Sequence, residues 1–337
     1  MSVNPYEARA GANRLLTNLA QTEFMMPELV LRILFPIAEV GQMGGLVPTF
    51  ESVWDGTEED DARAPGGNYN VVDDDWGSRP YKLDGRGLKY QIPEEKEVDA
   101  NTEGINVGER AVQVLMEKTA IKLEREQALI AGTAANYATG HTAALGADEK
   151  FNTASATPVN PGETLRAGNA VVRNKIGRDT NVLVLGDDSA DALAENPFVV
   201  DRIKHTGRDS ITMDMLANLY NYQLAVKVML PNTFKGLALS AYVDPRILAA
   251  WQPTNQGADL AGGFRVPYQI NRRITRFMAS FGFTYTYQGQ PRMSNRYWDE
   301  DTDSWCYKLK FNRSAEATGV DNSNKLIFGY LHTACVV

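Results

Sequence analysis

The chain has 337 residues, of which 43% are hydrophobic and 23% are charged, a composition that is typical of soluble globular proteins and excludes fibrous and largely disordered chains. Lysine and arginine total 34 against 42 aspartate and glutamate residues, so the formal net charge is -8 and a surface that mainly binds nucleic acid is not expected. The two cysteines, Cys306 and Cys335, have no metal-ligand spacing, which argues against a zinc ribbon and a disulfide framework.

Residues 1–43 are predicted to form an N-terminal arm. Residues 1–20 are polar and lack the apolar stretch of a secretory signal. The most apolar part, Leu29 to Val40, contains Arg32 and Pro36. Pro36 ends any helix here, and the run is too short to cross a bilayer. No membrane association is expected.

Residues 44–97 are rich in Gly, Pro, Asp and Trp, and they include acidic runs at 58–61 and 73–75. Short alternating pieces at 47–53 and 81–92 predict an extended β-hairpin with a loop-rich tip. Such a hairpin buries little of its own surface. We therefore expect its ordering to come from a neighbouring molecule.

The clearest helix is predicted over residues 107–131. Asn106 can cap its first turn, Glu109 can reach back to that cap, and Gly132 follows the last periodic residue. At 1.5 Å per residue the helix is roughly 37 Å long, the length of a small domain. We call it the spine helix, because other elements can pack along it.

Residues 162–263 alternate between helix and strand patterns and predict a compact mixed domain. Its helices are predicted at 163–175, 189–195 and 212–220, the second ending before Pro197, and its strands at 181–185, 223–230 and 236–243. From residue 264 strands dominate, at 274–287, 305–311 and 325–337. We expect these late strands to pack on the spine helix, so that 98–161 and 264–337 form one domain of an α+β fold.

This order of parts resembles the major capsid proteins of tailed bacteriophages, which have the Hong Kong ninety-seven type of fold. Tyr81-Lys82-Leu83 through Gly87-Leu88 to Ile92-Pro93-Glu94-Glu95 resembles the descending strand of that family's extended loop, and Glu109 to Ala131 resembles its spine helix. The core of its axial domain resembles Val182 to Gly186 with Leu193 to Pro197 and Leu216 to Val228. The likeness covers nearly the whole chain.

The resemblance implies a shell protein that assembles through hexamers and pentamers into an icosahedral head around double-stranded DNA. The loop at 44–97 would lie across a neighbouring subunit, 162–263 would be the axial domain, and the spine helix with its strands would be the peripheral domain. The implied partners are a portal, a possible decoration protein and packaged DNA bound without sequence specificity. Members of the family with a built-in assembly aid carry a long leader before the arm, so either a leader has been removed or a separate scaffolding protein exists, and Met1 favours the scaffolding protein. The implied location is the virion, after assembly in the host cytoplasm.

Arg272, Arg273 and Arg276 form the densest basic cluster. They could contact DNA phosphate, or acids of a neighbouring subunit such as Asp73 to Asp75 or Glu94 and Glu95. We favour the interface, because arginine suits carboxylate recognition. The predicted inter-subunit contacts are Asp73, Asp74, Asp75, Trp76, Lys82, Lys89, Glu94, Glu95, Arg272, Arg273 and Arg276.

No residue pattern predicts catalysis, a metal or a cofactor. Asp299 to Asp303 has alternating carboxylates but lacks the glycine and glutamate of a calcium loop, so a solvated turn is expected. His141, His205 and His332 are far apart in sequence and are interpreted as structural. Lys82 and Lys89 lie where some members of the capsid family form an isopeptide crosslink. No acceptor or activating acid can be located for it, so crosslinking is not expected.

Two other functions remain possible. An encapsulin-like compartment would use the same fold to enclose an enzyme cargo. A soluble α/β enzyme would need a convergent polar site in the middle of the chain, and it would leave residues 44–97 without a purpose.

Overall fold

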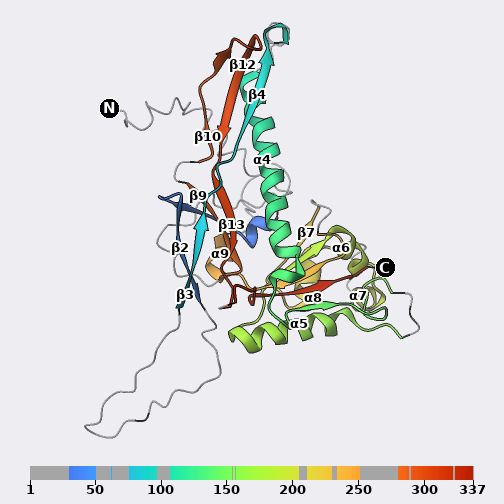
Figure 1. The fold of residues 1–337 in the computed structure, drawn as a ribbon. Helices are drawn as coiled ribbons and strands as arrows, with labels where there is room; N and C mark the ends of the chain where they lie inside the picture. The colour runs from blue at the N-terminus through green and yellow to red at the C-terminus, as the bar shows by residue number, and fades with distance from the viewer. Residues whose placement is uncertain are drawn as a thin grey trace.

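A computed structural model describes residues 30–50, 62, 76–96, 107–153, 155, 157–204, 211–229, 234–250, 280–287, 290–321 and 323–336. Helix α4 (Val107–Gly132) runs along the molecule between a small sheet near its N-terminal end and a larger, helix-covered sheet near its C-terminal end (Figure 1). The helix is one residue longer than predicted, because Gly132 is its last residue and does not lie beyond it. Among the described helices, none is both long and apolar enough to cross a membrane.

The larger sheet has five strands in the order β5-β14-β8-β6-β7. They are β5 (Thr142–Ala144), β14 (Gly329–Thr333), β8 (Ala238–Ala241), β6 (Val182–Gly186) and β7 (Leu224–Val228). Helices α5 (Pro161–Ile176), α6 (Asp187–Ala194), α7 (Pro197–Ile203), α8 (Met213–Tyr220) and α9 (Pro245–Ala250) accompany it, and η2 (Ala134–Asn136) follows α4. The mixed helix and sheet architecture confirms the predicted fold class.

Strand β6 separates two hydrophobic cores. Val182 and Val184 face a core that is shared with α4 and the N-terminal segment, whereas Leu183 and Leu185 face α6, α7 and α8. Because successive side chains of a strand point to opposite faces, a strand covered on both faces must be apolar throughout. All five residues of β6 are buried.

Two features of this part differ from the sequence prediction. The helix predicted to end before Pro197 does so, since α6 ends at Ala194, but a second helix that was not predicted, α7, begins at Pro197, with Asn196 as the cap that accepts a hydrogen bond from the amide of Phe198 at 3.0 Å. Proline suits the first turn of a helix, where its missing N–H has no partner to lose. The last strand, β14, was expected on the spine helix. It lies instead between β5 and β8, where its backbone pairs on both edges.

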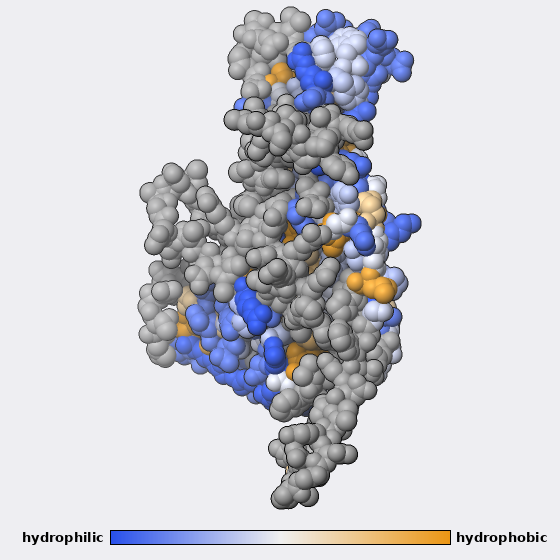
Figure 2. Space-filling model, turned by 90° about the vertical axis from the view of Figure 1, so that its left-hand side faces the viewer, coloured by the Kyte–Doolittle hydropathy of each residue, from blue (hydrophilic) through white to orange (hydrophobic). Residues whose placement is uncertain are grey.

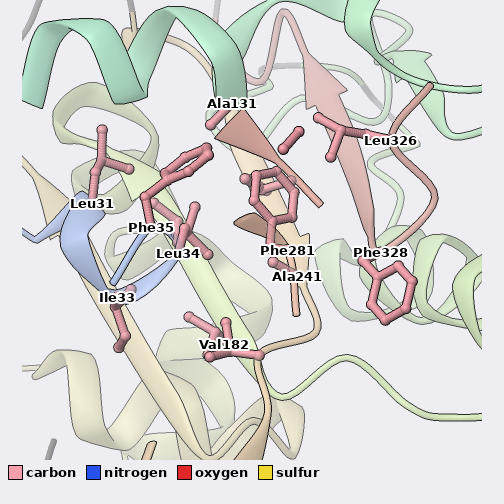
Figure 3. Packing of buried hydrophobic residues seen from close by; sticks show 14 of the residues in the cluster. Leu31, Ile33, Leu34, Phe35, Ala131, Val182, Ala241, Phe281, Leu326 and Phe328 are labelled. Atoms are coloured by element: carbon pink, nitrogen blue, oxygen red, sulfur yellow. The ribbon is translucent and has the colours of Figure 1, made fainter. Parts of the chain in front are cut away.

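A three-stranded sheet joins distant parts of the chain. Its order is β1-β9-β13, with β1 (Ile37–Val40) parallel to β9 (Gly282–Tyr287) and β13 (Arg313–Ala317) antiparallel to β9. The turn η1 (Leu31–Ile33) precedes β1. Leu31, Leu34 and Phe35 are fully buried, and the Phe35 ring meets Phe281 edge-on at 5.5 Å (Figure 3). The described end of the predicted arm is therefore part of the core.

A second small sheet, which we call the distal sheet, lies along the N-terminal half of α4. Strand β12 (Ser304–Lys310) pairs with β4 (Gly87–Pro93) on one edge and with β10 (Arg292–Met293) and β11 (Tyr297–Asp299) on the other. Tyr307 and Leu309 of β12 pack with Leu115 and Met116 of α4. For this strand, the expected return to the spine helix is confirmed.

Close packing at Gly186 gives a test of the larger sheet. A Cβ atom there would lie 2.2 Å from the carbonyl oxygen of Phe234, a backbone atom that cannot rotate away. We expect Gly186→Ala to lower the free energy of unfolding by about 1–3 kcal/mol or more, measured by urea unfolding. Gly85→Ala is the control, since a Cβ at Gly85 would meet no atom within 4 Å. Equal stability of the two variants would contradict the packing.

Candidate assembly surface

The base of the predicted hairpin is a two-stranded ribbon. Strand β2 (Gly44–Phe50) pairs antiparallel with β3 (Trp76–Lys82), and among the described strands each pairs only with the other. The alternating segment at 81–92 was predicted as one strand, but the structure has two. Strand β3 ends at Lys82, and β4 begins at Gly87 in the distal sheet.

Two contacts hold the ribbon against the rest of the same chain, and a backbone hydrogen bond closes its inner end. The Tyr81 ring stacks on Tyr285 of β9 with centroids 5.1 Å apart. The Arg79 guanidinium lies 3.5 Å from the Glu316 carboxylate of β13. The Leu83 amide donates to the Met43 carbonyl at 2.8 Å. Although a neighbour was expected to order the hairpin, its base is ordered by its own chain.

The ribbon exposes apolar surface. Leu46 of β2 is 67% exposed and lies opposite the exposed Pro80 of β3, and Met43 just before the ribbon is also exposed. The side of the molecule drawn in Figure 2 is mostly hydrophilic where residues are described, and its apolar side chains form separate small spots. Leu46 therefore stands out as a large apolar side chain without cover from the described part of the chain.

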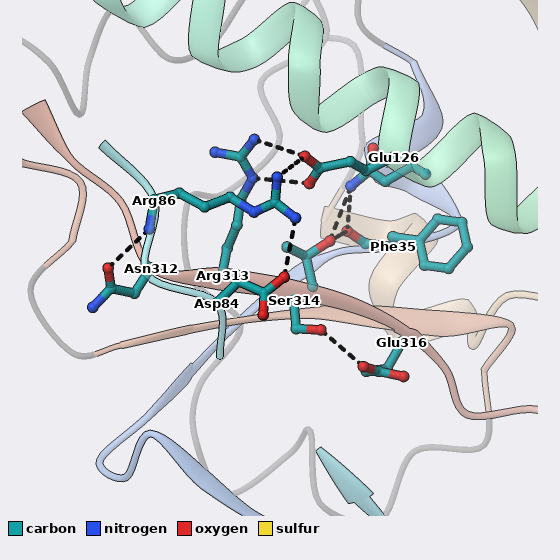
Figure 4. Close-up of polar contacts among 10 residues, drawn as sticks. Phe35, Asp84, Arg86, Glu126, Asn312, Arg313, Ser314 and Glu316 are labelled. Carbon is teal, nitrogen blue, oxygen red and sulfur yellow. Dashed lines mark hydrogen bonds and ion pairs between the residues drawn. The ribbon is translucent and has the colours of Figure 1, made fainter. Parts of the chain in front are cut away.

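A cluster of charges fixes the segment after the ribbon to the spine helix. The Glu126 carboxylate on α4 accepts hydrogen bonds from the guanidinium of Arg86 at 2.7 Å and from that of Arg313 at 3.3 and 3.4 Å (Figure 4). The Arg86 guanidinium also pairs with the Asp84 carboxylate at 3.1 Å. The Arg86 amide donates to the Asn312 side chain at 3.3 Å. Burial lowers the pKa of Arg313 and the Glu126 charge opposes this shift. The cluster ties the ribbon, α4 and β13 into one unit.

Two side chains one turn apart on α4 hold the N-terminal segment. Glu124 accepts hydrogen bonds from the amides of Val30 and Leu31 at 3.1 and 3.0 Å. Gln127 donates to the Thr284 hydroxyl at 2.9 Å and to the Phe35 carbonyl at 3.4 Å. Burial raises the pKa of Glu124 to about 7, and the amides and the Arg32 charge limit that rise.

The structure describes only some of the predicted inter-subunit contacts. Lys82 is exposed at the end of β3, and Glu94 and Glu95 are exposed directly after β4. Trp76 begins β3, but its side chain is outside the description. The remaining residues, Asp73, Asp74, Asp75, Arg272, Arg273 and Arg276, lie outside the described residues. All of these contacts stay predictions.

Lys89 has a partner within its own chain. Its ammonium pairs with Asp299 of β11, and this hydrogen bond raises the lysine pKa while it lowers that of the aspartate. A protonated amine cannot attack an amide carbon, so the pair disfavours a crosslink through Lys89. Asp299 ends β11, and the residues up to Ser304 form the hairpin turn that was expected for the acidic run.

The charges that organise this surface could not be recognised from the residue pattern. Glu126 and Arg313 are 187 positions apart, and Glu124 is 94 positions from Val30. In the sequence of the helix, Glu124 and Glu126 look like ordinary exposed acids, because the local pattern does not show whether a carboxylate contacts a distant residue or water. A glutamate close to the apolar face of the spine helix was the only available hint.

Comparison with known proteins finds proteins that are similar in sequence and in fold. No family model matches the chain. Over 284 residues it is 28% identical to the major capsid protein of Burkholderia phage BcepMu, and the match covers 83% of this chain and 85% of that protein. The fold matches a phage-related protein of Bordetella bronchiseptica RB50 with a TM-score of 0.71 and 24% identity, over 97% of this chain and 98% of that one.

The fold is also similar to that of a more distant protein from a mature phage capsid. The mature capsid protein of bacteriophage PhiM1 matches with a TM-score of 0.50 and 11% identity, over 90% of this chain and 86% of that one. At this level of identity the likeness concerns the fold. The chain is therefore similar in sequence to a phage major capsid protein, and it has the Hong Kong ninety-seven type of fold that phage capsid proteins share.

Proposed function

We propose that the chain assembles through hexamers and pentamers into the icosahedral head that encloses the double-stranded DNA of a tailed bacteriophage. The observation that carries this proposal is the β2–β3 ribbon, which pairs with no other described strand and exposes Leu46. An isolated two-stranded ribbon is marginally stable in water. A second subunit that covers the ribbon would bury its apolar surface.

The roles of the parts follow from the same proposal. The loop at 44–97 would reach the neighbouring subunit, and residues 162–263 would form the axial domain together with β5 and β14, which lie in its sheet. The rest of 98–161 and 264–337 would form the peripheral domain around α4. Residues 1–43 would be the arm. A net charge of -8 suits a container whose wall should release its DNA. The shell role requires no catalytic residue of this chain.

The proposed partners are other copies of the chain, a separate scaffolding protein, a portal and a possible decoration protein. The proposed location is the virion capsid, after assembly in the cytoplasm of the bacterial host. The sequence relation to a phage capsid protein favours a DNA-filled head over an encapsulin-like compartment.

Electron microscopy tests the function directly. The chain is expressed alone and with its neighbouring genes, and the purified products are examined by negative stain. Closed shells, or free hexamers and pentamers, are the expected result, and nuclease-protected DNA inside the shells supports the phage head. Protein cargo in place of DNA would favour the compartment. Monomers or small dimers under both conditions would contradict the shell function.

Leu46 gives a sharper test of the ribbon. We expect Leu46→Asp to reduce the yield of shells by at least about tenfold, because it places a charge in an apolar contact between subunits. The stability of the unassembled chain should change by less than about 0.5 kcal/mol, since the side chain is already exposed. Leu129→Asp on α4 is the control, since Leu129 is another exposed leucine outside the ribbon. Normal shell yield from Leu46→Asp would contradict this role of the ribbon.

A further inference from the structure

Two neighbouring side chains of α4 each leave one buried oxygen without a hydrogen-bond partner. Glu124 and Gln127 are both buried and lie three residues apart. Glu124 accepts the amides of Val30 and Leu31 with Oε1 alone. Within the described part of the chain, Glu124 Oε2 and Gln127 Oε1 have no hydrogen-bond partner. Because a buried polar atom without a partner is costly, these two acceptors call for a donor.

A proton on Glu124 would satisfy both oxygens at once. Residues three apart on a helix lie on the same face, close enough for their side chains to interact. An ionised carboxylate can only accept hydrogen bonds, whereas a protonated carboxyl group has one O–H donor. With the proton on Oε2, Glu124 can donate to Gln127 Oε1 while its own Oε1 keeps the two backbone amides.

We propose that Glu124 is protonated when residues 30–35 lie on α4, that its Oε2–H group donates to Gln127 Oε1, and that loss of this proton releases the segment. Both side chains bind that segment. Glu124 binds it at Val30 and Leu31, and Gln127 binds it at the Phe35 carbonyl. The shared proton therefore orients the two groups that attach the segment. The proposal concerns the single chain, so it holds or fails independently of the shell function.

Burial favours the neutral form of Glu124. Desolvation is the largest influence on its pKa and raises it to about 7, while the two backbone amides and the Arg32 charge act in the opposite direction. Glu126 points about 200° away from Glu124 around the helix, so its ion pairs face another side. The charged groups on the elements packed against this part of α4 are Arg32 of η1, Glu39 of β1, Arg313 of β13, and Glu126 with its partner Arg86.

The proton gives the attachment a definite pH dependence. The pKa of Glu124 is about 7 with the segment attached, against an ordinary value of 4.5 for the carboxyl group in water. Attachment is therefore strongest below pH 4.5 and weakens by up to about tenfold per pH unit as the pH rises to 7. Above pH 7 the proton no longer stabilises the attached state.

Attraction between an ionised Glu124 and the Arg32 guanidinium is the competing explanation for the attachment. It predicts the opposite dependence, with attachment strongest at high pH. The unpaired oxygens favour the proton, because an ionised Glu124 would leave its Oε2 and the Gln127 carbonyl oxygen without a donor.

Hydrogen exchange of the unassembled full chain between pH 5 and 8 tests the release. Mass spectrometry follows exchange in peptides that cover residues 30–35, corrected for the intrinsic effect of pH. In wild type, protection should fall by at least about tenfold from pH 5 to pH 8. Glu124→Gln should stay protected across this range, because its amide N–H replaces the proton. Glu124→Leu is the matched control, since it removes the same charge without supplying a donor or an acceptor, and it should be at least about tenfold less protected than Glu124→Gln at every pH.

Protection that rises with pH in wild type would overturn the proposal and favour the attraction to Arg32. Equal loss of protection in Glu124→Gln and Glu124→Leu would also overturn it. Circular dichroism confirms that each variant is folded.

Infrared spectroscopy detects the proton itself and the role of Gln127. The carbonyl band of a protonated carboxyl group should be present in wild type at pH 6, disappear as the pH rises through 7, and be absent from Glu124→Gln. Gln127→Met removes the acceptor and should lower the midpoint of this titration by about half a unit to one unit. Thr284→Val is its matched control, because it removes the hydroxyl that Gln127 Nε2 contacts but keeps the Gln127 carbonyl, so the midpoint should not change. Absence of the band in wild type, or equal midpoints in Gln127→Met and wild type, would overturn the shared proton.

Discussion

Arg313→Ala is expected to lower the free energy of unfolding by about 3–5 kcal/mol, because it removes one partner of a buried ion pair. Arg313 is 2% exposed and meets both carboxylate oxygens of Glu126. Without it, Arg86 is the one cation among the described residues that stays paired with Glu126, beside a cavity that had held a guanidinium. Urea unfolding of the unassembled chain measures the change.

Arg173→Ala is the matched control for this loss. Its guanidinium pairs with Asp179 at 3.3 Å, and both side chains are more than half exposed. Exposed pairs of this kind contribute about 0–1 kcal/mol. A loss for Arg313→Ala no larger than that for Arg173→Ala would show that the Glu126 cluster does not hold the ribbon segment to the spine helix.

Glu124 should make the chain less stable as pH rises. Its pKa is about 7 in the folded protein against an ordinary value of 4.5, so the folded state binds the proton more tightly than the unfolded state does. The resulting stability is full below pH 4.5 and is lost as pH rises through 7, by up to about 3 kcal/mol. Glu124→Gln removes this dependence. Unfolding in urea between pH 4.5 and 8 compares the two chains.

His332 opposes this trend over much of the same range. It is 1% exposed, and burial lowers its pKa to about 4 from 6.5, so its contribution is lost as pH falls below 6.5. In the native sequence, the effects of Glu124 and His332 on the pH dependence of stability nearly cancel between pH 4.5 and 6.5. Glu124→Gln should therefore reveal a rise in stability with pH across this window. A flat profile in that variant would contradict the buried environment of His332.

Local sequence signals predicted the elements that depend on local physics. The spine helix was predictable because its apolar periodicity lies within the segment, whereas its predicted cap, Asn106, lies outside the described residues. Strand β6 was predictable because a strand buried on both faces is continuously apolar. The acidic turn before Ser304 was predictable because turn residues act over a few positions.

Predictions failed where a local signal has two meanings. Pro197 correctly marked the end of α6, but proline also suits the first turn of a helix, and α7, which begins there and packs on α6, was not predicted. The C-terminal strand β14 has a pattern that fits either the spine helix or the larger sheet. Two open strand edges, on β5 and β8, decide its place, because unpaired backbone groups there would be costly to bury.

Residue patterns alone indicate the class of fold, the spine helix, the apolar strand β6 and the resemblance to phage capsid proteins. Which charges act together depends on how distant segments pack. Glu124 binds the Val30 amide and Glu126 binds the Arg313 guanidinium, because these two residues, from opposite ends of the chain, fold against α4. Lys89 and Lys308 lie opposite each other because β4 and β12 pair in one register. Electrostatic interactions depend on distance in space, and long-range pairing sets that distance.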